Sequence, residues 1–125
     1  MDRLGVGAAR ILVVEDEAPI RYTVADVLRC EGYEVDTATN GAEALATMRI
    51  TCPDAVLLDL MMPVMDGWAF LQHWRAEGFC GSTPILIVSA SRQAAETTQG
   101  VGVAGCIAKP FDLDELLGAV ECMLS

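Results

Sequence analysis

The chain has 125 residues, of which 53% are hydrophobic and 21% charged, and its formal net charge is −10. This length supports one domain with its own hydrophobic core, and no run approaches the roughly 18 apolar residues that a membrane-spanning helix needs. We therefore expect no membrane location. The negative charge would repel a phosphate backbone, so we also expect no direct binding to nucleic acid.

The N-terminal segment, "MDRLGVGAAR", carries charged residues among isolated apolar positions. It lacks the continuous apolar stretch of a secretory signal, so we expect a cytoplasmic protein. No repeat, linker or low-complexity tract interrupts the rest of the chain. We therefore expect residues 1–125 to form a single domain, with residues 1–9 as a flexible N-terminal extension.

Five short segments have the composition of β-strands. They are residues 10–14, 34–38, 54–59, 84–89 and 103–108. The first, third and fourth are apolar on both faces, which is typical of parallel strands that helices cover on both sides.

Helical patterns separate these strands. The first covers residues 19–31 and the third covers residues 67–77. The second begins at a cap formed by Asn40 with Glu43 and ends near Arg49. The last follows Phe111, where Asp112 and Glu115 have capping-box spacing. The last helix is expected to bury Leu113, Leu116, Leu117, Val120 and Leu124. Between the fourth and fifth strands, "RQAAETTQGVG" contains poor helix formers, so its helix should be short or mobile. Five strands that alternate with helices predict a doubly wound α/β domain, because crossovers are right-handed and place helices on both faces.

The five cysteines, Cys30, Cys52, Cys80, Cys106 and Cys122, are an odd number without a CxxC pair. His73 is the only histidine, so a mixed cysteine and histidine metal site has no support. We expect reduced thiols with structural roles, and an ordinary surface or boundary position for His73 within its helix.

Charged and hydroxyl side chains follow four of the predicted strands. Glu15 and Asp16 end the first strand, Asp59 the third and Ser89 the fourth, and Lys109 follows the fifth. In open parallel sheets, ligands bind beyond the carboxyl ends of the strands, so these side chains are expected to meet at one rim.

Three acids at one rim repel one another unless a cation is present, and an all-oxygen site of few ligands suits Mg²⁺. Asp59 could then act as a carboxylate nucleophile toward a phosphoryl group. Lys109 and the Ser89 hydroxyl could hold phosphoryl oxygens as charge develops. A plainer alternative for Asp16 or Glu17, just before Pro19, is a helix cap.

These residues resemble the receiver domain of two-component response regulators over essentially the whole chain. The matching motifs are Glu15 and Asp16, Asp59 in "DLMMPVMDG", Ser89 in "VSA" and Lys109 in "KPF". The resemblance implies a flavodoxin-like (βα)5 fold with strand order 2-1-3-4-5. It also implies a Mg²⁺ site made by Asp16, Asp59 and the Met61 carbonyl, with Glu15 acting through water, and a cis bond before Pro110.

Two features depart from the family pattern. Cys106 stands where the family usually has an aromatic switch residue, three positions before Lys109. The stretch from Ser89 to Lys109 is also about two residues short, so we expect the switch to use Ser89 and the following loop more than residue 106. A monomer or weak homodimer is expected, because the shortened stretch alters a face through which many relatives pair.

The resemblance implies a phosphorylation switch rather than a metabolic enzyme. A sensor histidine kinase or a histidine phosphotransfer protein would donate the phosphoryl group, and an unknown downstream protein would bind the face of helix four, strand five and helix five. The alternative is a pseudo-receiver scaffold that is never phosphorylated. A flavodoxin-like cofactor binder is disfavoured because "EDEAP" places acids where a phosphate-binding loop would lie, and an aspartate-nucleophile phosphatase because Met61 replaces its second acid.

Overall fold

Parallel strands form the centre of the structure, a computed structural model that describes residues 8–90 and 103–124. The strands are β1 (Arg10–Val14), β2 (Glu34–Ala38), β3 (Ala55–Asp59), β4 (Ile85–Ser89) and β5 (Val103–Ala108). Their order in the sheet is β2-β1-β3-β4-β5, and every pairing is parallel. Both the strand order and the parallel sheet are as predicted.

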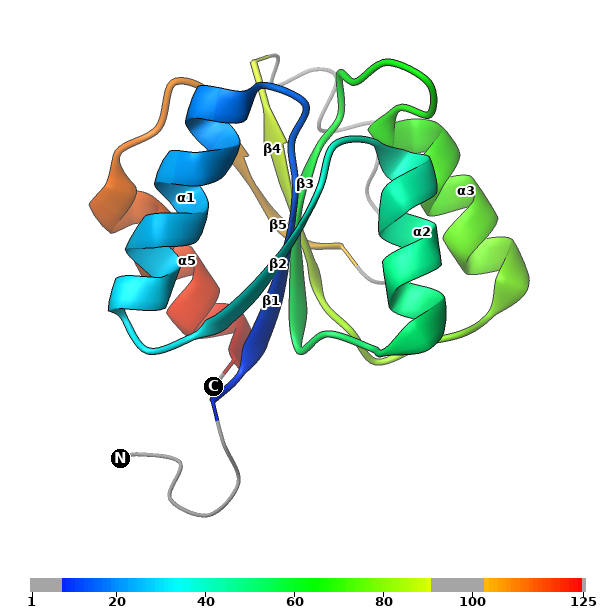
Figure 1. Cartoon of the computed structure of the whole chain (residues 1–125), viewed down its shortest axis with the longest axis horizontal. Coiled ribbons are helices and arrows are strands. Elements are labelled where there is room, and N and C mark those ends of the chain that lie inside the picture. Colours follow the sequence, from blue (N-terminus) through cyan, green and yellow to red (C-terminus); the bar gives the residue numbers. More distant parts are fainter. Residues whose placement is uncertain (1–7, 91–102, 125) are drawn as a thin grey trace.

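Helices cover both faces of this sheet. They are α1 (Ala18–Cys30), α2 (Gly41–Ile50), α3 (Gly67–Glu77) and α5 (Leu113–Leu124). Figure 1 shows α1 and α5 on one side of the sheet and α2 and α3 on the other, which confirms the doubly wound architecture. The helix expected between β4 and β5 falls on residues that lie outside the described part of the chain.

Two apolar clusters pack against the two faces, and each strand contributes to both by alternation. Leu12 and Leu58 point toward α2 and α3, whereas Val13 and Leu57 point toward α1 and α5. All five residues of β3 are buried, so this strand is the centre of the core. Burying each large aliphatic side chain contributes about 1.5–3 kcal/mol, which is why a short strand can be held so firmly.

The strand boundaries differ from the prediction by one residue at two starts. Asp54 precedes β3 and accepts a hydrogen bond from the Arg10 amide, at 2.7 Å, with its side chain. Pro84 precedes β4 and has no amide hydrogen to donate to a sheet, although its carbonyl accepts from the Val56 amide. Both residues therefore form hydrogen bonds to neighbouring strands, although each lies just before its own strand begins.

Side-chain caps start two of the helices, and the cap at Asn40 was expected from the sequence. Asn40 accepts from the Glu43 amide at 2.9 Å, and the Glu43 carboxylate accepts in return from the Thr39 amide at 2.8 Å. Asp66 caps α3 by accepting from the Ala69 amide. Glu17 stands at the start of α1 but makes no side-chain cap, so the helix-cap interpretation of the acids before Pro19 is not supported.

Two smaller expectations are corrected. Ala9 is 2% exposed and its carbonyl accepts from the Glu34 amide, so it belongs to the packed domain and not to an N-terminal extension. Leu113, expected inside, is 37% exposed because it lies in the first turn of α5, ahead of the buried residues Leu116 and Val120.

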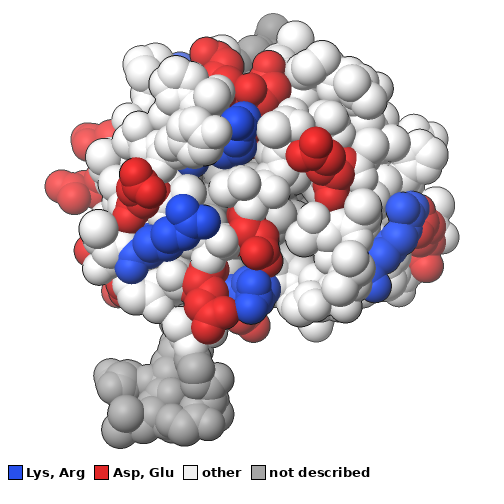
Figure 2. Space-filling model, in the orientation of Figure 1, with Lys and Arg blue, Asp and Glu red and all other residues white. Residues whose placement is uncertain are grey.

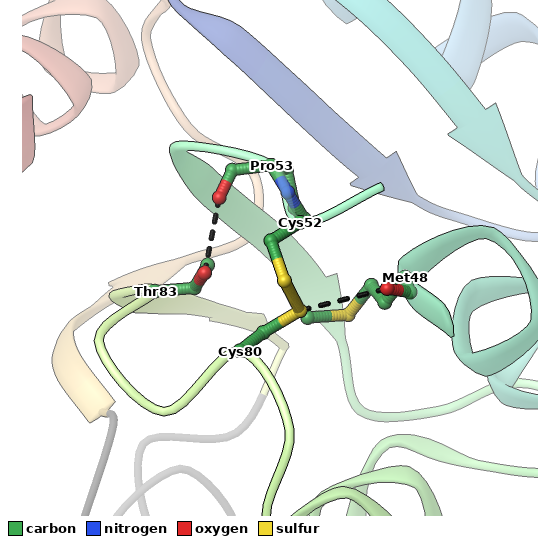
Figure 3. The surroundings of a disulfide bond; sticks show 5 residues. All are labelled: Met48, Cys52, Pro53, Cys80 and Thr83. Carbon is green, nitrogen blue, oxygen red and sulfur yellow. Dashed lines mark hydrogen bonds between the residues drawn. A yellow bond between two sulfur atoms is a disulfide. The ribbon is translucent and has the colours of Figure 1, made fainter. Parts of the chain in front are cut away.

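The expectation of five reduced cysteines is wrong for two of them. Cys52 and Cys80 form a disulfide with their Cα atoms 5.5 Å apart (Figure 3). The pairing follows from the topology, because Cys52 lies just before β3 and Cys80 just before β4, and these strands are neighbours. Beside the disulfide, the Thr83 hydroxyl donates to the Pro53 carbonyl at 3.0 Å. Cys30, Cys106 and Cys122 do not take part in this disulfide and are exposed.

Gly67, the first residue of α3, lies directly against the end of β3. Its amide donates to the Leu60 carbonyl at 2.9 Å. A Cβ atom at this position would come within 2.7 Å of the Leu60 Cα and 2.8 Å of the Asp59 carbonyl oxygen. Only glycine permits this close approach of α3 to the strand end.

We predict that Gly67→Ala lowers the free energy of unfolding by about 1–3 kcal/mol, because backbone atoms must shift to admit the methyl group. Gly118→Ala is the matched control, since a Cβ atom at this exposed helical position meets nothing within 4 Å. It should raise stability by about 0.5–1 kcal/mol through better helix propensity. Urea denaturation measures both, and a similar midpoint shift in the two variants would contradict this account.

Candidate functional site

The carboxyl ends of four strands meet at one rim of the sheet, as the sequence predicted. The register aligns Val14 with Leu58, Asp59 with Val88, and Ser89 with Ala108. The residues that follow these strands therefore emerge side by side, at the upper edge of the sheet in Figure 1.

Three carboxylates gather at this rim. Each of Glu15, Asp16 and Asp59 offers one oxygen, and these oxygens lie within 4.8 Å of one another. Glu15 and Asp59 are both only 4% exposed, whereas Asp16 is half-buried. Beneath Glu15 and Asp59 lies a cavity of about 20 Å³ with mostly apolar walls. The acids thus have little water to screen their repulsion.

Lys109 supplies the positive charge opposite the acids. Its Nζ atom lies 2.9 Å from Glu15 Oε1 and 3.3 Å from Asp59 Oδ2. Its backbone amide donates to the Ser89 carbonyl at 2.8 Å, which fixes the two residues relative to each other. The Lys109–Pro110 peptide bond is cis, as the family resemblance implied.

Burial disfavours the charged form of Glu15. Burial is the main reason that the pKa of Glu15 is raised; the hydrogen bond from Lys109 offsets part of this effect, and the charge of Asp59 adds to it. Burial alone would lower the pKa of Lys109, but its hydrogen bond to Glu15 and the charge of Asp59 raise it overall. Lys109 therefore stays cationic, and the cluster still favours additional positive charge.

These residues fit a Mg²⁺ ion. Magnesium binds oxygen ligands, retains several waters and usually takes only a few carboxylates from the protein. Three clustered carboxylates with one half-exposed member offer such ligands together with access to water.

The other predicted site residues, Ser89, Met61 and Cys106, differ in how far they are exposed to solvent. Ser89 is 1% exposed at the end of β4. Met61 is 63% exposed, and its amide lies 3.3 Å from Asp59 Oδ1 as a hydrogen-bond donor. Its carbonyl as a metal ligand stays a prediction, as does the switch role of Ser89. Cys106 is exposed on β5, and its switch role stays a prediction.

The loop between Asp59 and α3 is fastened near its base and projects at its tip. The Gly41 amide, at the start of α2, donates to the Met65 carbonyl at 2.8 Å. Met62 is buried in the core, whereas Val64 is 86% exposed and has a left-handed backbone with φ of 67°. Met61 and Val64 are thus apolar side chains presented to solvent beside the acidic cluster.

Arg21 is a site residue that the sequence interpretation missed. It is 9% exposed, and its Nη1 atom donates to the Glu15 carbonyl at 3.0 Å and the Asp16 carbonyl at 3.2 Å. The guanidinium thereby holds the backbone that carries both acids. A charged residue on the apolar face of α1, one position after Ile20, was the signal that could have revealed it.

The surface charges outside the site are mixed. Arg10 pairs with Glu34 and Asp36 at 2.8 Å each, and Arg49 pairs with Glu77 at 2.6 Å across α2 and α3. Figure 2 shows basic side chains separated from one another among acidic ones, without a basic patch on this face. Over the described ranges, no helix combines the length and apolar character needed to span a membrane.

Comparisons with known proteins agree with the geometry. Residues 11–121 match the family model of the response regulator receiver domain. The transcriptional regulatory protein PrrA of Mycobacterium leprae is 37% identical over 122 residues, which cover 96% of this chain and 52% of that protein. The response regulator MprA of Mycobacterium sp. strain KMS is 38% identical over 117 residues, covering 92% of this chain and 50% of MprA. This chain therefore spans about half the length of these curated relatives.

Solved structures show the same fold. The chemotaxis protein CheY4 of Vibrio cholerae is similar with a TM-score of 0.86 and 35% identity, covering 94% of this chain and all of that one. A CheY-like receiver domain protein of Methanospirillum hungatei has the same TM-score at 27% identity, with 94% of each chain covered.

We predict that Arg21→Gln destabilises the fold by about 2–3 kcal/mol, because it removes charge-assisted hydrogen bonds to two carbonyls in a buried setting. Arg49→Gln is the matched control, since it removes an ion pair on the exposed surface and should cost much less. Thermal and urea unfolding compare the two variants. Equal losses would show that Arg21 does not hold the acidic loop.

Proposed function

We propose that this chain, which belongs to the family of response regulator receiver domains, is a phosphorylation switch. It would act in a two-component phosphorelay. The phosphoacceptor is Asp59. The observation that carries this proposal is the position of its carboxylate, at the end of a fully buried strand and 3.3 Å from the ammonium of Lys109.

In the proposed reaction, an Asp59 oxygen attacks the phosphorus of the donor and forms an aspartyl phosphate as the bond to the leaving group breaks. Lys109 attracts the phosphoryl oxygens and opposes the charge that develops on them. Arg21 keeps the backbone of Glu15 and Asp16 in place. The Ser89 hydroxyl is proposed to donate a hydrogen bond to a phosphoryl oxygen once the group is attached.

Mg²⁺ is the proposed cofactor, held by Asp16, Asp59 and the Met61 carbonyl, with Glu15 acting through water. When bound, the ion neutralises charge on the acids and on the incoming phosphoryl oxygens. The three clustered carboxylates and the raised pKa of Glu15 support this assignment.

The donor is proposed to be a histidine kinase or a histidine phosphotransfer protein. His73 is exposed on α3, away from the strand ends that carry Asp59, which supports a donor from another protein. A largely apolar pocket of about 590 Å³ opens beside Lys109, between α1 and Pro110–Leu113, and would suit a partner's apolar side chains.

The output is proposed to be a change in binding to a downstream protein, through the face that includes β5 and α5. We propose a cytoplasmic monomer or weak homodimer that does no metabolic catalysis beyond its own phosphorylation and dephosphorylation. A second candidate is a scaffold that is not phosphorylated. Cys106 favours it, because an exposed thiol replaces the ring through which many relatives report phosphorylation.

Incubation with Mg²⁺ and a small acyl phosphate should add one phosphoryl group to the intact protein, because Asp59 is a carboxylate nucleophile at the rim of the sheet, beside Lys109. Mass spectrometry measures the addition, and Asp59→Asn should abolish it. Asp66→Asn is the matched control, since this aspartate of the same loop acts as a helix cap, a role that asparagine fills equally well. No addition to the wild-type protein at any Mg²⁺ concentration would favour the scaffold.

Loss of one acid should weaken the metal site. We predict that Asp16→Asn raises the Kd for Mg²⁺ by roughly tenfold or more, because a charged oxygen ligand is lost. Titration calorimetry measures this, with Asp26→Asn on the exposed surface of α1 as the matched control. Unchanged affinity in Asp16→Asn would exclude Asp16 as a ligand.

A further inference from the structure

We propose that Cys52 and Cys80 form a reversible redox site, which cycles between a dithiol and a disulfide by exchange with low-molecular-weight disulfides and thiols. Closure of the disulfide stabilises the segment that carries Asp59. This inference does not depend on the proposed phosphorylation chemistry.

The pair encloses the central part of the domain. The two cysteines are 28 positions apart, and the loop they close contains β3, the loop after Asp59, and α3. A crosslink of this span removes many conformations from the unfolded chain and so favours the folded state. The disulfide lies near the amino ends of β3 and β4, whereas Asp59 ends β3 at the opposite rim. Its effect is therefore on stability and not on the reacting atoms.

The two cysteine residues differ in exposure, which favours exchange at Cys52. Cys52 is exposed, whereas Cys80 is half-buried and packs against the apolar cluster under α2 and α3. Thiol–disulfide exchange needs a sulfur that an incoming thiolate can reach. The sulfur of Cys52 is therefore the one that a small thiolate attacks during reduction. During oxidation, the Cys52 thiolate is the one that attacks a small disulfide first.

The fold also offers a hydrogen-bond acceptor to Cys80 when the disulfide is reduced. Cys80 Sγ lies 3.5 Å from the Met48 carbonyl oxygen (Figure 3). A disulfide sulfur has no hydrogen to donate, but a Cys80 thiol can donate to this oxygen. Met48 lies in the last turn of α2, where helix carbonyls need partners from outside the helix. Reduction thus leaves Cys80 with a hydrogen-bond acceptor already in position.

Oxidation proceeds in two exchanges. The Cys52 thiolate attacks a low-molecular-weight disulfide, RSSR, and releases one RS⁻. The Cys80 thiolate then attacks the Cys52 sulfur of the mixed disulfide and releases the second RS⁻. Two electrons pass from the protein thiols to RSSR, and the two cysteine protons end on the two RSH molecules. Disulfides in cytosolic proteins are usually transient or redox-sensing, which agrees with a reversible pair in a cytoplasmic protein.

The test uses the full chain with oxidised glutathione or with excess reduced glutathione, followed by alkylation and mass spectrometry. Peptides containing Cys52 and Cys80 should be alkylated at both sites after reduction, and joined to each other without glutathione after oxidation. The change should reverse when reduced glutathione is restored. Alkylation of both sites in the two buffers, or a glutathione adduct that stays on Cys52, would overturn the proposal.

Thermal unfolding in the two buffers tests the effect on stability. Oxidation should raise the wild-type midpoint by roughly 10 °C. Cys80→Ser should lose this difference, whereas Cys30→Ser, which replaces an exposed cysteine of α1, should keep it. Equal midpoints of the wild-type protein in both buffers would refute the coupling, as would an undiminished difference in Cys80→Ser.

Discussion

Repulsion among buried carboxylates is the constraint on which the functional rim depends. Glu15 and Asp59 are both almost completely buried, and Asp16 beside them is half-buried. The ammonium group of Lys109 is the positive charge that offsets these three acids. Such a cluster is tolerated only because the surrounding structure is rigid. The buried strand β3 fixes Asp59, Arg21 fixes the backbone of Glu15 and Asp16, and the Ser89 carbonyl fixes Lys109. The apolar core thus supplies the stability that the charged rim lowers.

The fold was largely predictable because its signals are local and repeated. Apolar runs of strand length alternate with helical patterns, and the cap predicted at Asn40 agrees with the tertiary structure. The strand order was different, since it came from the family resemblance and not from periodicity. The two strand starts that shifted by one residue did so at Asp54 and Pro84, where side-chain bonding and a missing amide hydrogen decide the boundary.

The site was predictable where function depends on strand ends, and unpredictable where it depends on contacts across the chain. Glu15, Asp59 and Lys109 could be placed together because parallel strands end at one rim. Arg21 bonds to carbonyl groups, and no sequence motif marks a backbone acceptor. The Cys52–Cys80 pairing required knowing that β3 and β4 are neighbours, and counting cysteines carried no such information.

The loop after Asp59 combines a constrained base with side chains that are exposed to solvent. Its base is constrained, because Gly67 lies against Leu60 and the Gly41 amide bonds to Met65. Its tip is not packed, since Met61 and Val64 face solvent beside the acidic rim. Substitutions of these two side chains would therefore change the surface beside the acidic rim while β3 and α3 beneath it keep their positions. In the proposed phosphorelay, they would change what a partner protein meets without altering the residues that react.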